Sequence, residues 1–305
     1  MPEVVAVFEA LDTQDFEAAI RALENAARIL PAYVPHGAAA IAKMHEHADA
    51  LKEILVQTIA GNHPHVPPDI PDEKFWACRK FLSHFLAGKK AGCVFTLNYD
   101  LLLYWTLMHE DMPFGEPIVL AMNDGFGNDE DEPGADYVVW QGETNAHSAC
   151  VQFLHGALHL FDSGKELKKY TWVRTNVPLV EQARAAIAID AYPLFVPEGT
   201  SAQKKAKIRH NAYLYQGFKQ FTANVQTGTH CMFIFGHSLA ENDDHILNRI
   251  GKGRFKKLYV GIYGDPLEPA NENIMKRANA LALQRHEKWP LEVAFYDAES
   301  AHVWG

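Results

Sequence analysis

At Cys93-Val94-Phe95-Thr96-Leu97-Asn98-Tyr99-Asp100 an apolar run rich in β-formers passes directly into a polar segment. The apolar part is short and continuous, which is typical of a strand that is buried on both faces of a sheet. A helical pattern over residues 101–109 follows at once. This order of strand, polar turn and helix predicts an α/β fold whose chemistry lies where the strands end.

Strand and helix patterns alternate from this point to the end of the chain. The alternation predicts a doubly wound, mostly parallel, Rossmann-like sheet that is flanked by helices. The predicted strands are 93–97, 137–140, 150–161, 193–196, 231–235, 258–262 and 291–296, and the predicted helices are 101–109, 179–188, 201–222, 244–250 and 271–286.

The sequence before this point has a different pattern. Apolar residues recur at helical spacing over 15–29, 38–59 and 72–86, and a cluster of Gly, His and Pro at 61–68 interrupts them. We therefore expect a helical region over residues 1–90 and an α/β domain over 91–305. The helical region is either a separate lobe or packed on the sheet.

Charge and hydropathy restrict the kinds of partner that the chain is expected to bind, in particular nucleic acid and membranes. The formal net charge of −10 disfavours sequence-independent binding of nucleic acid, and the basic runs are short, Lys204-Lys205-Ala206-Lys207 and Arg254-Phe255-Lys256-Lys257. A local basic patch remains open. No apolar run approaches the roughly 20 residues that span a membrane, and residues 1–7 lack the pattern of a signal peptide. We expect a cytoplasmic protein that does not enter membranes.

The sequence does not predict a metal site. The four cysteines lie far apart, with no Cys-x-x-Cys pair, so neither a zinc ribbon nor a disulfide framework is expected. His45, His47, His63 and His65 lack the spacing of a zinc finger or of a His-Glu-x-x-His helix, and they are expected to be surface residues.

Three strand ends bring polar residues to the expected catalytic edge. The first is the turn Thr96 to Asp100, where Asp100 could instead cap the next helix and Asn98 could simply complete the turn. The second is His155-Gly156, a place where backbone can approach a ligand and an imidazole can titrate, although a hydrogen-bonded core histidine explains it too. The third runs from Gly236 through Ser238 to Asp243, where backbone N–H groups suit a nucleotide unless the acidic residues only cap a helix.

Taken together and in this order, these motifs resemble those of the SIR2-like (sirtuin-like) proteins. The resemblance rests on the Thr-x-Asn-Tyr-Asp turn, the His-Gly pair and the Gly-x-Ser-Leu strand end followed by an acidic residue, and it covers residues 93–246. The segment 195–200, followed by Lys204 and a helix that reaches Leu214, resembles the sirtuin-like subgroup known as DUF4917, which extends the resemblance over most of the chain.

The resemblance implies hydrolysis of NAD at the nicotinamide–ribose bond, in bacteria typically as an antiviral defence effector. It implies that Asn98 and His155 are the catalytic pair and that NAD is bound without a metal. A non-catalytic subunit that binds NAD or ADP-ribose is the alternative, assembled with itself or with an ATPase. The implied NAD-binding residues are Thr96, Asp100, Gly156, Gly236, Ser238 and Asp243, with Gly236 and Ser238 on the adenosine side.

Two family features are missing from this sequence. Protein-deacylating sirtuins carry four cysteines in two close pairs, which are not present, so NAD hydrolysis is favoured over deacylation. Family members also open with a strand that ends in a Gly-x-Gly or Gly-Ala-Gly turn, and none precedes the helices here. Either the chain as given begins late or it is a degenerate relative, and we expect an exposed edge or an unfilled position in the sheet that a partner would cover.

Overall fold

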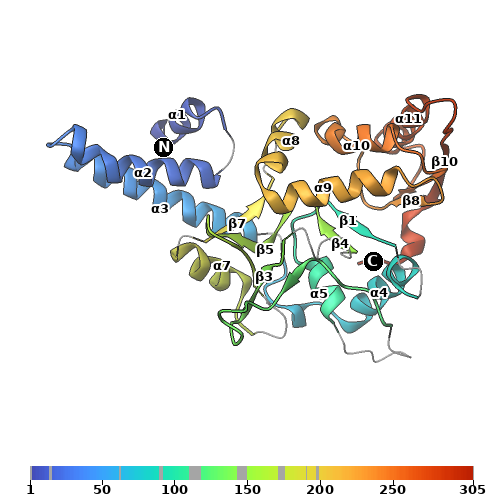
Figure 1. The fold of residues 1–305 in the computed structure, drawn as a ribbon, viewed down its shortest axis with the longest axis horizontal. Helices are drawn as coiled ribbons and strands as arrows, with labels where there is room; N and C mark the ends of the chain where they lie inside the picture. Colours follow the sequence, from blue (N-terminus) through green and yellow to red (C-terminus); the bar gives the residue numbers. More distant parts are fainter. Residues whose placement is uncertain are drawn as a thin grey trace.

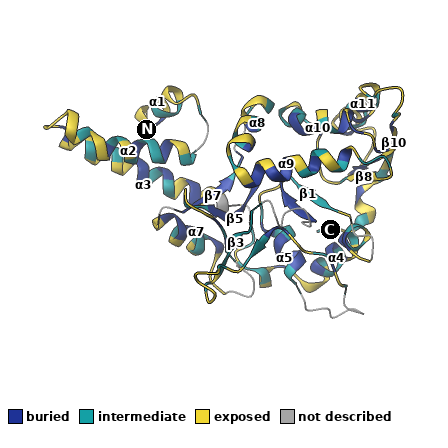
Figure 2. Cartoon of the chain, viewed as in Figure 1, coloured by how far each residue is buried: buried dark blue, intermediate teal, exposed yellow. Residues whose placement is uncertain are grey.

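The computed structural model shows an α/β protein. It describes residues 2–13, 16–61, 63–88, 92–109, 118–142, 150–170, 176–189, 191–196 and 199–304, so the predicted helix start at residue 15 and residues 197 and 198 lie outside the described part. Figure 1 shows the helices and strands in order along the chain, and Figure 2 shows which of them are buried.

The N-terminal part is helical, as predicted. Helices α2 (Phe16–Tyr33), α3 (Ala38–Ala60) and α4 (Asp72–Leu86) match the three predicted patterns, and α1 (Pro2–Ala10) precedes them. Helices α2 and α3 pack side by side and extend away from the sheets, while α3 also contacts α7 (Leu179–Ala188). Apolar residues of α2 and α3, among them Ile20 and Leu51, belong to the same buried cluster as the residues of the sheets.

Two of the sheets are parallel. Strand β1 (Val94–Thr96) pairs with β4 (Val151–Phe153), so that Thr96 lies opposite Phe153. Strands β8 (Cys231–Ile234), β9 (Lys257–Ile262) and β10 (Glu292–Asp297) form the second sheet in the order β10-β9-β8. These strands come from the predicted apolar runs, and they carry the strand ends that the sequence singled out.

The third sheet is antiparallel, which the sequence analysis did not predict. Its order is β2-β3-β6-β5-β7, and every neighbouring pair within it is antiparallel. Its strands are β2 (Phe126–Gly127), β3 (Tyr137–Trp140), β6 (Leu167–Tyr170), β5 (Gly156–Asp162) and β7 (Tyr192–Phe195). The described strands thus form mixed parallel and antiparallel sheets and not one mostly parallel sheet.

A single turn accounts for much of this difference. The predicted strand 150–161 is divided at Leu154 and His155, because Gly156 adopts a φ of +78° and redirects the chain. The part before the turn pairs with β1, and the part after it pairs with β6 and β7. Strand β6 was missed because its four residues, Leu-Lys-Lys-Tyr, are few and do not alternate between apolar and polar types.

The remaining helices surround the strand ends. They are α5 (Leu102–Met108), α8 (Ser201–His210), α9 (Ala212–Val225), α10 (Asp244–Gly251) and α11 (Pro269–Leu283). The predicted helix 201–222 is two helices, because Asn211 leaves the helical conformation and its side chain accepts a hydrogen bond from the Leu214 N–H, capping α9. Among the described residues, no helix combines the length and apolar character needed to cross a membrane.

Strands β1 and β8 lie at the edges of the two parallel sheets. Within the described ranges each has one strand neighbour, as expected for a sheet with an exposed edge. In β8 the side chain of Phe233 remains 43% exposed, although its ring lies 5.3 Å from that of Phe85 in α4. Phe235, just after the strand, lies 5.0 Å from Phe81 of the same helix. Helix α4 therefore covers this region only partly.

Candidate functional site

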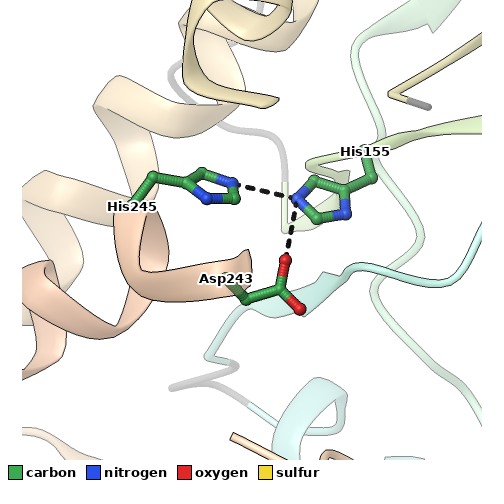
Figure 3. A group of neighbouring side chains, drawn as sticks. All are labelled: His155, Asp243 and His245. Carbon is green, nitrogen blue, oxygen red and sulfur yellow. Dashed lines mark hydrogen bonds and ion pairs between the residues drawn. The ribbon is translucent and has the colours of Figure 1, made fainter. Parts of the chain in front are cut away.

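A cluster of titratable side chains lies where β4 ends and α10 begins (Figure 3). His155 follows β4, Asp243 ends the short helix η2 (Glu241–Asp243), and His245 lies in the first turn of α10. Lys204 of α8 and His237, which follows β8, complete the group, which we call the His155 cluster. His155, Lys204 and His245 are each no more than 5% exposed, although they are polar.

The contacts within the His155 cluster centre on one carboxylate and one imidazole. Lys204 Nζ donates to Asp243 Oδ1 at 3.1 Å, and His237 Nε2 lies 3.4 Å from Asp243 Oδ2. His155 Nε2 lies 3.9 Å from Asp243 Oδ1 and 3.1 Å from His245 Nε2. Asp243 thus lies against a lysine and two histidines, and the carboxylate is the negative centre of the group.

The backbone around His155 explains its fixed position. The His155 carbonyl accepts a hydrogen bond from the Val196 N–H, which ties the turn to the end of β7. A Cβ at Gly156 would lie only 1.9 Å from the Leu194 carbonyl oxygen, so only glycine allows this close approach of β5 to β7. The His-Gly pair therefore holds the imidazole at the end of β4.

The chain after β8 positions the other histidine of the cluster. Gly236 has a φ of +64°, and the buried Leu239 adopts a φ of 54°, a conformation that is costly for a branched side chain. The Leu239 N–H donates to His237 Nδ1 at 2.8 Å, which leaves His237 Nε2 facing Asp243. Local strain in this turn thus accompanies the placement of His237 beside Asp243.

The cluster combines a charged pair with neutral imidazoles. Burial lowers the pKa of His155 to about 3, reinforced by the neighbouring His245 and opposed by Asp243. Burial also lowers the pKa of His245 to about 4. Burial alone would raise the pKa of Asp243, but hydrogen bonds from His237 and Lys204 outweigh it and hold this pKa well below the ordinary value. At neutral pH the carboxylate is charged and both buried imidazoles are neutral.

His155, Asp243 and His245 also resemble a metal-ligand set. One ligand atom from each side chain lies within 4.8 Å of the others, and two histidines with a carboxylate suit divalent first-row metals. The Lys204 ammonium, however, lies 3.1 Å from the same Asp243 oxygen. A divalent ion would have to displace this ammonium against charge repulsion, so the geometry favours Lys204 as the counter-ion of Asp243.

Removal of Lys204 tests that role. Lys204→Met leaves the partly buried Asp243 carboxylate without its lysine partner, and we expect the free energy of unfolding to fall by roughly 3 kcal/mol. Urea denaturation monitored by circular dichroism measures the change. The matched control is Lys43→Met, which breaks the exposed ion pair with Glu3 and is expected to leave stability nearly unchanged. Equal effects of the two substitutions would show that Lys204 is not a buried counter-ion.

The two buried histidines predict a dependence of stability on pH. Their folded pKa values lie below the ordinary 6.5, so the unfolded chain binds protons first as the pH falls. The free energy of unfolding should therefore decrease between pH 6.5 and about 4, by at most about 1.4 kcal/mol per pH unit for each histidine. Denaturant midpoints across this range should show a shallower slope in His155→Gln. The exposed His45→Gln is the control and should keep the wild-type slope.

The predicted catalytic Asn98 follows β1, the strand that pairs with β4. Thr96 and Phe153 are paired across the two parallel strands. Asn98 comes two residues after Thr96, and His155 comes two residues after Phe153, so both follow the ends of adjacent strands. The Asn98 N–H donates to Thr96 Oγ1 at 3.0 Å, and the Asn98 residue is exposed. Among the described side chains, no hydrogen bond joins Asn98 to His155, although both leave the same edge of the β1–β4 sheet.

Asp100 lies one residue before Leu101, the N-cap residue of α5. Its Oδ1 accepts from the Leu102 N–H at 2.9 Å, at the start of α5. His63 Nε2 accepts from the neighbouring Leu101 N–H, which corrects the expectation that His63 is a surface residue. His47 is buried as well, whereas His45 and His65 are exposed as expected.

The remaining predicted residues divide into two groups. His155 and Asp243 come together as the centre of the cluster, with Gly156 forming the turn beside them. Gly236 and Ser238 lie in the turn after β8, and neither has a described hydrogen bond to His155. Two cavities flank α10, one toward α8 and α9 and one toward α11, and neither is lined by Asn98 or His155.

Sequence reasoning missed Lys204, His237 and His245 as members of the site. Lys204 lies one helical turn before the buried Ile208, so it occupies an inward-facing position of α8. A lysine on such a face is a signal for a buried partner, and it could have been found. The two histidines lie within the segment that was singled out, but their roles depend on contacts with distant elements.

One comparison with known proteins gives a match. The model of a family described as a domain of unknown function (DUF4917) matches residues 1–304. No curated protein and no solved structure matches the chain.

Proposed function

Since the chain belongs to the DUF4917 family, a domain of unknown function, we propose its activity from its own side chains: it hydrolyses the nicotinamide–ribose bond of NAD. The observation that carries this proposal is the neutral, buried His155 at the end of β4, level with Asn98 at the end of β1. Membership of the SIR2-like group, suggested by the order of the motifs, is part of the same proposal.

Hydrolysis of the nicotinamide–ribose bond requires only a weak catalytic base. Nicotinamide leaves as a neutral molecule from a cationic precursor, so no general acid is required. The barrier lies in forming an oxocarbenium-like ribose and adding water to it. Asn98 would orient the water or a ribose hydroxyl through its carboxamide. His155 would accept the proton that water loses as it bonds to the ribose carbon, giving ADP-ribose, nicotinamide and one proton in all.

The electrostatics of the cluster fit this role. Once His155 is protonated, the Asp243 carboxylate 3.9 Å away stabilises the imidazolium. Lys204 moderates that attraction, because its ammonium disfavours a second positive charge nearby. A base with a pKa of about 3 is weak, and it suits a step in which water meets an already cationic ribose.

The same weak basicity supports a second candidate, a non-catalytic subunit that binds NAD or ADP-ribose. Asn98 is exposed and has no described hydrogen bond to His155, and the two flanking cavities are not lined by either residue. Such a subunit would assemble with itself or with a partner such as an ATPase.

Release of nicotinamide distinguishes the two candidates. Purified protein is incubated with NAD, with and without a chelator, and free nicotinamide is followed by chromatography. Hydrolysis that survives the chelator supports the proposal. No release, combined with a rise in melting temperature when ADP-ribose is added, supports the binding subunit instead.

A further inference from the structure

A second group of charged side chains, all cationic, lies near the His155 cluster. It begins with Lys205, the residue that follows Lys204 in α8. The side chains of Lys205 and Arg209 in α8, Lys219 in α9 and Arg249 in α10 line a hollow of about 320 Å³. Two aromatic residues, Tyr215 and Phe218, form part of its wall. The three helices contact one another and lie side by side in Figure 1. No carboxylate lines this hollow, which we call the basic pocket, although the chain carries a net charge of −10.

Three of the four cations of the basic pocket, Lys205, Arg209 and Arg249, are not accounted for by anions of the described residues. Within the described residues, no ion pair involves Lys205, Arg209 or Arg249. The Arg249 guanidinium lies instead 5.2 Å from the centre of the buried Phe218 ring, which fixes its direction. Arg209 lies in the last turn of α8 and Arg249 in the last turn of α10, so attraction to the helix C-terminus explains why these positions are cationic. It does not explain Lys205, which lies in the middle of α8. Positive charges held around one hollow repel each other unless an anion enters.

The size and lining of the basic pocket indicate the class of anion. A volume of about 320 Å³ exceeds what a single small ion fills and lies at the lower end of small-molecule sites. Arginine and lysine together match the oxygens of linked phosphates. Tyr215 is 38% exposed at the edge, where its ring can contact an apolar or aromatic group of the ligand.

We propose that the basic pocket binds a small molecule that carries two or more linked phosphates, at a site separate from the His155 cluster. The two sites are nonetheless connected through α8, where Lys204 reaches Asp243 and the next residue, Lys205, lines the basic pocket. The ligand also bridges to α10, whose first turn holds His245. Its binding therefore stabilises the packing of the helices that hold the cluster. This inference stands whether or not the chain hydrolyses NAD.

Calorimetric titration of the full chain with inorganic pyrophosphate and with ADP tests the proposal. Both probes should bind, with affinity that falls as salt is added. The double variant Lys205→Glu/Arg249→Glu reverses the charge of two lining side chains. It should weaken binding by roughly 10–100-fold for each reversed charge. Lys205→Gln/Arg249→Gln should weaken it in the same direction, and it replaces the charge-reversed variant if that variant does not fold. The same titrations in His155→Ala should give wild-type affinity for pyrophosphate.

The matched control is Arg28→Glu/Lys276→Glu, which makes the same change of charge on α2 and α11, away from the basic pocket, and should bind as the wild type does. The proposal is overturned if neither probe binds to the wild type, or if the basic-pocket variants bind as tightly as the control. A single-stranded oligodeoxynucleotide that binds when pyrophosphate and ADP do not would overturn it too, because it would make the basic pocket part of a nucleic-acid surface.

Discussion

His155→Ala is expected to lower the rate of nicotinamide release from NAD by on the order of 10²–10⁴-fold, the usual contribution of a positioned base. The substitution removes the only imidazole that lies level with Asn98 among the described strand ends, while the Lys204–Asp243 pair stays in place. Because the proton acceptor is removed and not the binding surface, kcat should fall more than KM changes. Steady-state assays of free nicotinamide measure both constants.

Asn98→Ala should lower the same rate by a comparable factor, because the carboxamide would orient the water or ribose hydroxyl. The matched control is His84→Ala, which removes a histidine of α4 that lies outside the His155 cluster and should leave the rate unchanged. Unchanged turnover in both His155→Ala and Asn98→Ala would end the catalytic assignment. A loss that occurs equally in His84→Ala would indicate a general effect on the protein.

Gly156→Ala should have the largest effect on stability. The new methyl group would lie 1.9 Å from the Leu194 carbonyl oxygen and 2.9 Å from the Phe195 Cα, both of which are backbone atoms that cannot rotate away. The residue must also keep a φ of +78°, which alanine rarely adopts. We expect a loss of at least about 5 kcal/mol in the free energy of unfolding, enough to leave a typical domain largely unfolded. Thermal denaturation and the yield of soluble protein measure it.

Gly134→Ala is the matched control for that substitution. Gly134 lies in an exposed turn, and a Cβ there would meet no atom within 4 Å. The melting temperature should stay close to that of the wild type. If Gly156→Ala melted at the same temperature as this control, the turn between β4 and β5 would have a different geometry from the one described.

Local patterns predicted most of the helices and strands, but not how the strands pair. Strand β3 and helix α7 have the predicted bounds, because a compact β-rich run and an amphipathic stretch each identify an element locally. Pairing depends instead on where the chain turns. One left-handed glycine at residue 156 divides a continuous apolar run into a parallel and an antiparallel strand, and no periodicity of hydrophobic residues reports it.

The candidate site was predictable to the extent that strand ends are visible in a sequence. His155 and Asp243 were singled out because each follows or adjoins an apolar run, and the fold brings them within 3.9 Å. Lys204 comes from a helix that is distant in sequence from β4, and its role depends on helix packing. Asp100 shows the opposite case, since its described side-chain hydrogen bond is to the backbone at the start of α5.

The contact between His155 and His245 decides which nitrogen of His155 is available. With the two Nε2 atoms 3.1 Å apart, a single proton lies between the rings, and His245 Nδ1 faces the Ser201 hydroxyl at 3.4 Å. If the Ser201 hydroxyl donates to His245 Nδ1, the hydrogen of His245 is on Nε2 and is donated to His155 Nε2. His155 Nδ1 then carries a hydrogen and has no lone pair that could accept a proton. If Ser201 accepts, the order reverses and His155 Nδ1 is free to take a proton. The tautomer of His155 is thus coupled to the partners of the next ring, the Ser201 hydroxyl and the Asn242 backbone.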